Sequence, residues 1–205
     1  MCKMDQRRVV LASGNPGKLR EFSELLAASG LTLVRQSDFG INPPPETGST
    51  FLENALIKAR NAAIATGLPA IADDSGIEVD ALGGAPGVHS ARFAGENASD
   101  EANLIKLLAA LEDQPANARA ARYRCVIVFV DSGRDPHPLV GEGVWEGHII
   151  ATRRGQGGFG YDPSFVPVGE TRTVAEMPAD EKNLHSHRGQ AMRAFLAQFA
   201  NLARR

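Results

Sequence analysis

Cysteine is scarce in this chain of 205 residues. The only two, Cys2 and Cys125, stand near the start of the chain and inside an apolar, strand-like run. This pattern matches neither a disulfide framework nor a zinc site, because the chain has no series of paired cysteines and no close cysteine cluster. A reducing environment suits such a protein, and we expect a cytoplasmic location.

The start of the chain lacks a long hydrophobic run. Residues 1–10 carry charges and only a brief apolar stretch, too short for a signal peptide or a membrane-spanning helix. We therefore expect no targeting segment and no membrane association.

Positive charge is not in excess either. The chain has 22 lysines and arginines against 24 acidic residues, a net charge of -2. A broad nucleic-acid-binding surface is therefore not expected, and a nucleotide-like ligand is expected to be small and bound in a pocket. The 43% of hydrophobic and 22% of charged residues are ordinary for a globular protein, and the length fits a single domain over residues 1–205.

The most informative stretch is residues 69–80, where an apolar run of strand type ends on Asp73 and Asp74. Side chains alternate between faces along a strand, so both carboxylates point the same way only if the chain turns between them. We expect one carboxylate to face a cleft while backbone donors hold the other. Burial without a cation, a metal or strong donors would be costly. The alternative is a turn built from Asp73, Asp74, Ser75 and Gly76 that joins two strands.

A glycine-containing turn joins a predicted strand over residues 8–12 to a predicted helix over residues 19–28. Its backbone N–H groups and the positive end of the helix dipole favour a phosphate group, and Lys18 adds a cation. An ordinary strand-to-helix turn is the alternative, because the spacing is not that of a Walker loop. The turn consists of Ser13, Gly14, Asn15, Pro16, Gly17 and Lys18.

Three prolines, 43–45, follow a second predicted strand over residues 32–35 and exclude a helix or an inner strand. They place Glu46 on a stiff loop, either as a metal ligand or as a solvated acid. Thr50 and Glu53 then predict a capping box for a helix that runs to about Thr66.

On this helix, Leu52, Leu56, Ala59 and Ala63 form the predicted apolar stripe. Asn54, Lys58 and Asn61 share another face. That polar face is either solvated or presents Lys58 to phosphates.

The middle of the chain predicts further regular elements. Ser99 is expected to cap a helix to about Leu111 whose inward side carries apolar residues. Residues 123–130 predict a strand buried on both faces, and residues 140–152 a long strand or hairpin arm. The inward residues of the helix are expected to be Leu104, Ile105, Leu107, Leu108 and Leu111.

A second glycine-rich loop, residues 153–165, carries aromatic residues. Stacking of a nucleobase would explain Phe159 on such a loop, and Asp162 is placed to accept a hydrogen bond from a ring N–H. The alternative is a tight turn with Phe159 and Tyr161 packed on the core.

Three potential donors lie near the start of the last predicted helix. Lys182, His187 and Arg188 precede or open a helix whose apolar residues repeat at helical spacing. The helix dipole adds to their positive character. The inward residues are predicted to be Ala191, Met192, Phe195, Leu196, Phe199 and Leu202.

Six ordered sequence blocks together resemble the inosine triphosphate pyrophosphatase family, and most closely its bacterial members. They cover nearly the whole chain from residue 13 to residue 189. The blocks are residues 13–18; 50–55 with Lys58 and Ala59; 72–76; 83–87 with 90–92; 158–163; and Glu181 and Lys182 with 186–189.

The resemblance implies an α/β fold: an elongated, two-lobed structure with a long twisted mixed sheet flanked by helices and a nucleotide cleft between the lobes. It also implies Mg²⁺-dependent hydrolysis of non-standard purine nucleoside triphosphates (XTP, ITP and dITP) to the monophosphate and pyrophosphate, by a homodimer. Two other functions stay open: pyrophosphatase action on modified pyrimidine or methylated nucleotides, and nucleotide binding without catalysis.

The resemblance and the residue chemistry together suggest roles. Glu46 and Asp74 are expected to hold Mg²⁺, and Asp74 to position or deprotonate the attacking water. The expected substrate-binding residues are Ser13, Gly14, Asn15, Pro16, Gly17, Lys18, Lys58, Ser75, Phe159, Gly160, Tyr161, Asp162, Lys182, His187 and Arg188.

Overall fold

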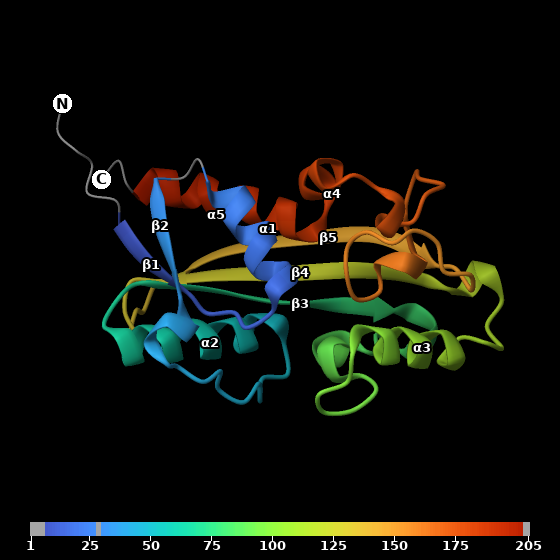
Figure 1. The fold of residues 1–205 in the computed structure, drawn as a ribbon, viewed down its shortest axis with the longest axis horizontal. Coiled ribbons are helices and arrows are strands. Elements are labelled where there is room, and N and C mark those ends of the chain that lie inside the picture. Colours follow the sequence, from blue (N-terminus) through green and yellow to red (C-terminus); the bar gives the residue numbers. More distant parts are fainter. Residues whose placement is uncertain (1–6, 28–29, 203–205) are drawn as a thin grey trace. The chain divides into compact units, whose positions relative to one another are not determined.

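The computed structural model of the chain describes residues 7–27 and 30–202, so that Cys2 and Ala28 lie outside the described residues (Figure 1). The main elements, in chain order, are β1 (Arg7–Leu11), α1 (Pro16–Leu26), β2 (Leu31–Arg35), α2 (Phe51–Thr66), β3 (Ala70–Val79), α3 (Asp100–Ala110), β4 (Ala120–Val130), β5 (Leu139–Ile149), β6 (Phe165–Pro167), α4 (Ala179–His185) and α5 (His187–Leu202). Across these two ranges, no helix is both long and apolar enough to cross a membrane.

The strands form one six-stranded sheet in the order β2-β1-β3-β4-β5-β6. The sheet is mixed, because β1 pairs in parallel with both β2 and β3, whereas β5 and β6 are antiparallel. The predicted α/β class, with a mixed sheet and flanking helices, is therefore confirmed.

The chain forms two compact units, and it passes from one to the other four times. The first comprises the described parts of Met1–Asp74, Val126–Glu142 and Ala191–Arg205, and the second comprises Ser75–Cys125 and Gly143–Gln190. The strands β3, β4 and β5 and the helix α5 each contribute residues to both units. The boundary in β3 falls between Asp74 and Ser75.

In the first unit, the order β2-β1-β3 makes α1 and α2 the crossovers between parallel strands. Two right-handed crossovers that leave in opposite directions along the sheet place their helices on opposite faces, as Figure 1 shows for α1 and α2. Val9, Val10 and Leu11 of β1 are buried between these layers, as are Phe22 and Leu26 of α1. The helix predicted over residues 19–28 begins three residues earlier than expected, at Pro16.

The core of the second unit lies around β3, β4 and α3. Ser99 caps α3 as predicted, since its side chain accepts a hydrogen bond from the N–H of Ala102. The predicted inward side of α3 is partly wrong, because Ile105 is 54% exposed while Asn103 is buried and bonds the backbone of Ala91 and Ala94. The buried cluster consists of Ile77, Val79, Leu104, Leu107, Leu111, Ala121, Tyr123, Ile149, Tyr161, Phe165 and Val174.

Residues 69–80 differ from the prediction. The expected break after Asp73 and Asp74 is absent, and so is the alternative turn, because β3 runs without interruption from Ala70 to Val79. Successive side chains of a strand lie on opposite faces. The two carboxylates therefore point away from each other, and different helices supply their partners.

Candidate active site

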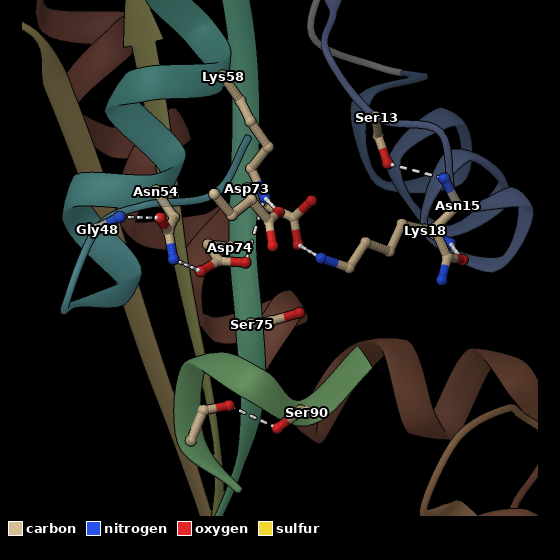
Figure 2. A network of polar contacts seen from close by, with 12 residues as sticks. Ser13, Asn15, Lys18, Gly48, Asn54, Lys58, Asp73, Asp74, Ser75 and Ser90 are labelled. Atoms are coloured by element: carbon tan, nitrogen blue, oxygen red, sulfur yellow. Dashed lines mark hydrogen bonds and ion pairs between the residues drawn. The ribbon is translucent and has the colours of Figure 1, made fainter. Parts of the chain in front are cut away.

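Asp73 and Asp74 are consecutive residues in the middle of β3, and their exposed fractions are only 1% and 4%. Figure 2 shows Lys18 reaching Asp73, whereas Asn54 and Lys58 reach Asp74. A buried carboxylate needs a nearby cation or donor to offset its lost hydration. The two helices on opposite faces of the sheet provide such partners, which explains how an Asp-Asp pair fits inside a regular strand.

The partner of Asp73 is Lys18, whose Nζ lies 2.9 Å from Asp73 Oδ2. Lys18 occupies the first turn of α1, where its N–H donates to Asn15 Oδ1 at the helix N-cap. Ser13 Oγ in turn accepts from the N–H of Asn15 at 3.3 Å. Residues 13–18 thus join a strand to a helix N-terminus and hold a lysine over a buried acid. Phosphate binding by this turn stays a prediction.

The partners of Asp74 come from α2. Lys58 Nζ donates to Asp74 Oδ1 at 3.1 Å and to Glu46 Oε1 at 2.7 Å, so one ammonium joins two carboxylates. Asn54 Nδ2 donates to Asp74 Oδ2 at 3.1 Å. The prediction left Glu46 as either a metal ligand or a solvated acid, and the structure brings it to the same lysine as Asp74.

Burial and charge shift the pKa values of this group. Burial is the main cause that raises the pKa of Asp74 above the usual aspartate value of 3.8, against the opposing effect of Lys58 and Lys18. For Lys58, burial is the largest single contribution and lowers the pKa, but Asp74, Asp73 and Glu46 together outweigh it and raise the pKa. Lys58 is thus a cation at neutral pH, and Asp74 takes up a proton more readily than an ordinary aspartate.

The buried face of α2 agrees only partly with the predicted apolar stripe, of which Ala59 and Ala63 are buried. The capping box is confirmed, because Thr50 Oγ1 accepts from the N–H of Glu53. Asn54 and Lys58, however, are buried among the alanines, while Leu52 and Leu56 are only half-buried. Polar residues that bind a buried carboxylate satisfy their hydrogen bonds inside the protein, so the most hydrophobic face need not be the buried one.

Carboxylate oxygens near Lys58 fit the requirements of Mg²⁺. Within residues 7–27 and 30–202, no group of three or more His, Cys, Asp or Glu side chains is arranged as a metal site. Mg²⁺ prefers oxygen ligands and is usually held by one or two carboxylates together with substrate phosphates and waters. Glu46 and Asp74, both within hydrogen-bond distance of Lys58 Nζ, match that smaller set.

The two aspartates are expected to differ in their contribution to stability. Because burial raises the pKa of Asp74, its ionised form is held at a cost, so Asp74→Asn is expected to change the unfolding free energy little. Asp73→Asn leaves Lys18 without its carboxylate and is expected to cost more, about 1–3 kcal/mol.

Urea unfolding of both variants and the wild type at pH 7 measures this difference. A larger loss for Asp74→Asn than for Asp73→Asn would contradict the division of roles. Asp113→Asn, on an exposed residue after α3, is a matched control.

In the second unit, Asp162 joins three groups that include residues predicted to bind the base. It is buried, its Oδ1 accepts from the Tyr123 hydroxyl at 3.0 Å, and its Oδ2 accepts from the Phe159 N–H at 3.0 Å and from Lys182 Nζ at 2.9 Å. Asp162 thus holds the glycine-rich loop and Lys182 in place. Acceptance of a base N–H by Asp162 stays a prediction.

The two aromatic residues of the glycine-rich loop have different surroundings. Tyr161 is buried and donates its hydroxyl to the carbonyl of Ser90 at 2.7 Å, as the packed-turn alternative proposed. Phe159 is only half-buried, with Lys182 Nζ 4.6 Å and Arg188 Cζ 5.8 Å from its ring centroid. A ring that carries cations and retains exposed surface suits stacking with a flat ligand.

His187 and Arg188 lie in the same unit, at the start of α5. The ring of His187 stacks on Tyr123 at 4.6 Å between centroids, with 9° between the planes. Arg188 is buried, and its Nη2 donates to Ser75 Oγ at 2.9 Å. Gly160 is fixed by its N–H, which donates to Asp100 Oδ2.

Sequence reasoning missed two residues that organise these groups. Tyr123 was counted as part of an apolar strand, although its hydroxyl binds Asp162 and burial raises its pKa well above the ordinary value, which keeps the hydroxyl protonated. Asn54 was assigned to a face that is solvated or presents Lys58 to phosphates. Its position four residues before Lys58, on one helix face, was the available signal.

In the first unit, buried carboxylates with lysines suit a phosphate group and a divalent cation. In the second unit, an aromatic ring beside two cations suits a flat base. These are the chemical needs of an enzyme that acts on nucleotides. The chain belongs to the Ham1 family, whose model matches residues 9–198. It is 56% identical over 189 residues to the dITP/XTP pyrophosphatase of Thioalkalivibrio sulfidiphilus, covering 92% of this chain and 96% of that protein. It is 58% identical over 186 residues to the dITP/XTP pyrophosphatase of Methylococcus capsulatus, covering 91% of this chain and 92% of that protein.

The fold also matches a solved structure. The HAM1 protein of Coxiella burnetii superposes with a TM-score of 0.88 at 48% identity, covering 95% of this chain and 99% of the other. The family resemblance inferred from the six sequence blocks is confirmed.

Proposed function

We propose that the chain hydrolyses non-standard purine nucleoside triphosphates (XTP, ITP and dITP) to the nucleoside monophosphate and pyrophosphate. The observation that carries this proposal is Asp74, a buried carboxylate of raised pKa that shares Lys58 with Glu46. Relatives at 56% and 58% identity that are named dITP/XTP pyrophosphatase support the substrate class.

The first unit supplies the groups for the phosphates. Asp74 orients the attacking water and accepts its proton, a task that a carboxylate of raised pKa performs better than an ordinary one. Lys18 and Lys58 balance the negative charge that grows on the phosphate as the water attacks the α-phosphorus and pyrophosphate leaves. Glu46 and Asp74 hold Mg²⁺, which, when bound, supplies additional charge neutralisation at the phosphate oxygens. The turn from Ser13 to Lys18 binds phosphate at the N-terminus of α1, where the helix dipole favours an anion.

The second unit supplies the groups for the base. Inosine and xanthine present a carbonyl acceptor at position 6 and an N1–H donor, whereas adenine reverses both roles. Donors from Lys182, His187 or Arg188 therefore pair with the 6-carbonyl, and adenine leaves them unpaired, which is a strong penalty.

Several other residues take part in substrate binding under this proposal. Phe159 stacks with the base, and Gly160 and Tyr161 hold the loop that carries it. Asp162 is assigned to the N1–H side of the base, and Ser75 contacts the nucleotide through its hydroxyl or backbone N–H. A homodimer and a cytoplasmic location also belong to the proposal.

Release of pyrophosphate from a panel of nucleoside triphosphates, with and without Mg²⁺, tests the function. The panel contains ITP, dITP, XTP, ATP, GTP, a methylated purine nucleotide and a modified pyrimidine nucleotide. We expect release from the first three only, and only with Mg²⁺. Preference for a pyrimidine or methylated nucleotide would favour a related pyrophosphatase, and binding without release would favour a nucleotide-binding module.

A further inference from the structure

Asn54 of α2 is fully buried and binds both the strand and the loop that carry the candidate metal ligands. Its Nδ2 donates to Asp74 Oδ2 at 3.1 Å, and its Oδ1 accepts from the N–H of Gly48 at 2.8 Å (Figure 2). A backbone N–H can only donate and an ionised carboxylate can only accept, so the two partners fix which way the amide faces.

Lys58, one helical turn further along α2, makes a parallel pair of contacts. It donates to Asp74 Oδ1 and to Glu46 Oε1, two residues before Gly48. Residues four apart on a helix lie on one face. Asn54 and Lys58 therefore hold one oxygen each of Asp74 on one side, and the loop of residues 46–48 on the other.

We propose that Asn54 is a positioning residue for the hydrolytic reaction: it fixes the rotation of the Asp74 carboxylate and the place of the Glu46 loop relative to it. A contact from Lys58 alone would leave the plane of the Asp74 carboxylate free to turn, because a flexible ammonium would hold only one of its two oxygens. The second contact, from Asn54, removes that freedom. This inference rests on the proposed function of Asp74.

Three variants separate the two contacts. Asn54→Leu keeps a side chain of similar size and removes both hydrogen bonds. Asn54→Asp retains an oxygen for the Gly48 N–H but sets a carboxylate against Asp74. Gly48→Ala leaves Asn54 in place, yet its Cβ would meet Asn54 Oδ1 at 2.7 Å and Glu53 Cβ at 2.6 Å, so the loop must move away from α2. The φ of Gly48 is not positive, so this substitution acts through these contacts and not through backbone strain.

We expect each variant to lower kcat for ITP about 10–100-fold, the usual loss when a group that orients a reactive side chain is removed, while KM stays within a few-fold. Asn61→Leu, two turns along the same helix, is the matched control and should retain wild-type kcat. A purely structural role would lower the folded fraction and leave kcat per folded molecule unchanged, and that result would overturn the proposal. If Asn54→Leu does not fold, Gly48→Ala decides: unchanged kcat at unchanged KM overturns the proposal.

A crystal structure of Asn54→Leu gives a second readout that does not need turnover. We expect a rotated Asp74 carboxylate and a displaced loop at residues 46–48, and an unmoved Asp74 and loop would overturn the inference. If the wild type hydrolyses none of the tested nucleotides, the proposed function fails, whereas the crystal structure still decides whether Asn54 positions Asp74.

Discussion

Replacement of Asp74 by asparagine is expected to reduce kcat for ITP by about 10³-fold or more, while the affinity for the nucleotide stays within a few-fold of the wild type. The amide keeps the size of the side chain and can still contact Lys58, but it cannot accept a proton from water. A general base contributes about 10²–10⁴-fold to a rate, and the loss of one metal ligand adds to this. Pyrophosphate release measures kcat, and calorimetry with ITP measures binding.

The control for Asp74→Asn is the same substitution at Asp113, which is exposed and should leave both quantities unchanged. A variant at position 74 that retains near wild-type kcat would remove the catalytic role from Asp74. The proposal of hydrolysis would then need another base.

The second large effect is expected for Lys58→Met, which removes the cation shared by Glu46 and Asp74. Removing one partner of a buried ion pair costs about 3–5 kcal/mol. Glu46 is one-quarter exposed and regains some hydration, so we expect the lower end, about 3 kcal/mol, together with a large loss of kcat. Urea unfolding and pyrophosphate release measure the two effects.

This loss of stability should depend on pH in a defined direction. Lys58 is the main cause that lowers the pKa of Asp74, so its removal raises that pKa further. A group whose pKa is higher in the folded state than in the unfolded state contributes stability at low pH that is lost as the pH rises through the folded value. The deficit of Lys58→Met relative to the wild type should therefore be smaller near pH 4 than at pH 7.

Arg60→Met is the control, because Arg60 is exposed on the same helix; its stability should follow the wild type at both pH values. An equal deficit for Lys58→Met at pH 4 and pH 7 would mean that the cation does not act through the ionisation of Asp74.

The regular elements of the first unit were predictable because their signals are local. The strand at residues 32–35 and the helix that ends at Thr66 agree with β2 and α2 to within a residue. Hydrophobic periodicity and a capping box depend on neighbours in the sequence, which a single sequence displays in full.

The predicted interruption of the strand at Asp73 and Asp74 was wrong because the contacts that decide it are not local. Asp, Ser and Gly favour turns when only local backbone preferences are considered. In the folded chain, Lys18 and Lys58 arrive from two helices and compensate the two carboxylates in place. The partners of a buried acid lie far away in the sequence, so local pattern cannot show that a strand continues through it.

The candidate site was predictable in its residue types but not in its contacts. Glu46, Lys58 and Asp74 were singled out individually, yet only the structure shows one ammonium between two carboxylates. Tyr123 was interpreted only as part of an apolar strand, and Asn54 only as part of a polar helix face. Their partners, Asp162 and Asp74, lie far away in the sequence, so the pattern of apolar and polar residues could not show these contacts.

The small side chains on the buried face of α2 also constrain how this protein can change over time. Ala55, Ala59, Ala62 and Ala63 lie in the core together with Asn54 and Lys58. A larger residue at any of these positions would force the helix outward and draw Asn54 and Lys58 away from Asp74, since a close-packed core has no spare room. Substitutions in this part of the sequence are therefore limited by the need to keep Asn54 and Lys58 within reach of Asp74 as well as by packing. The buried alanines thus support the proposed reaction by setting the position of α2.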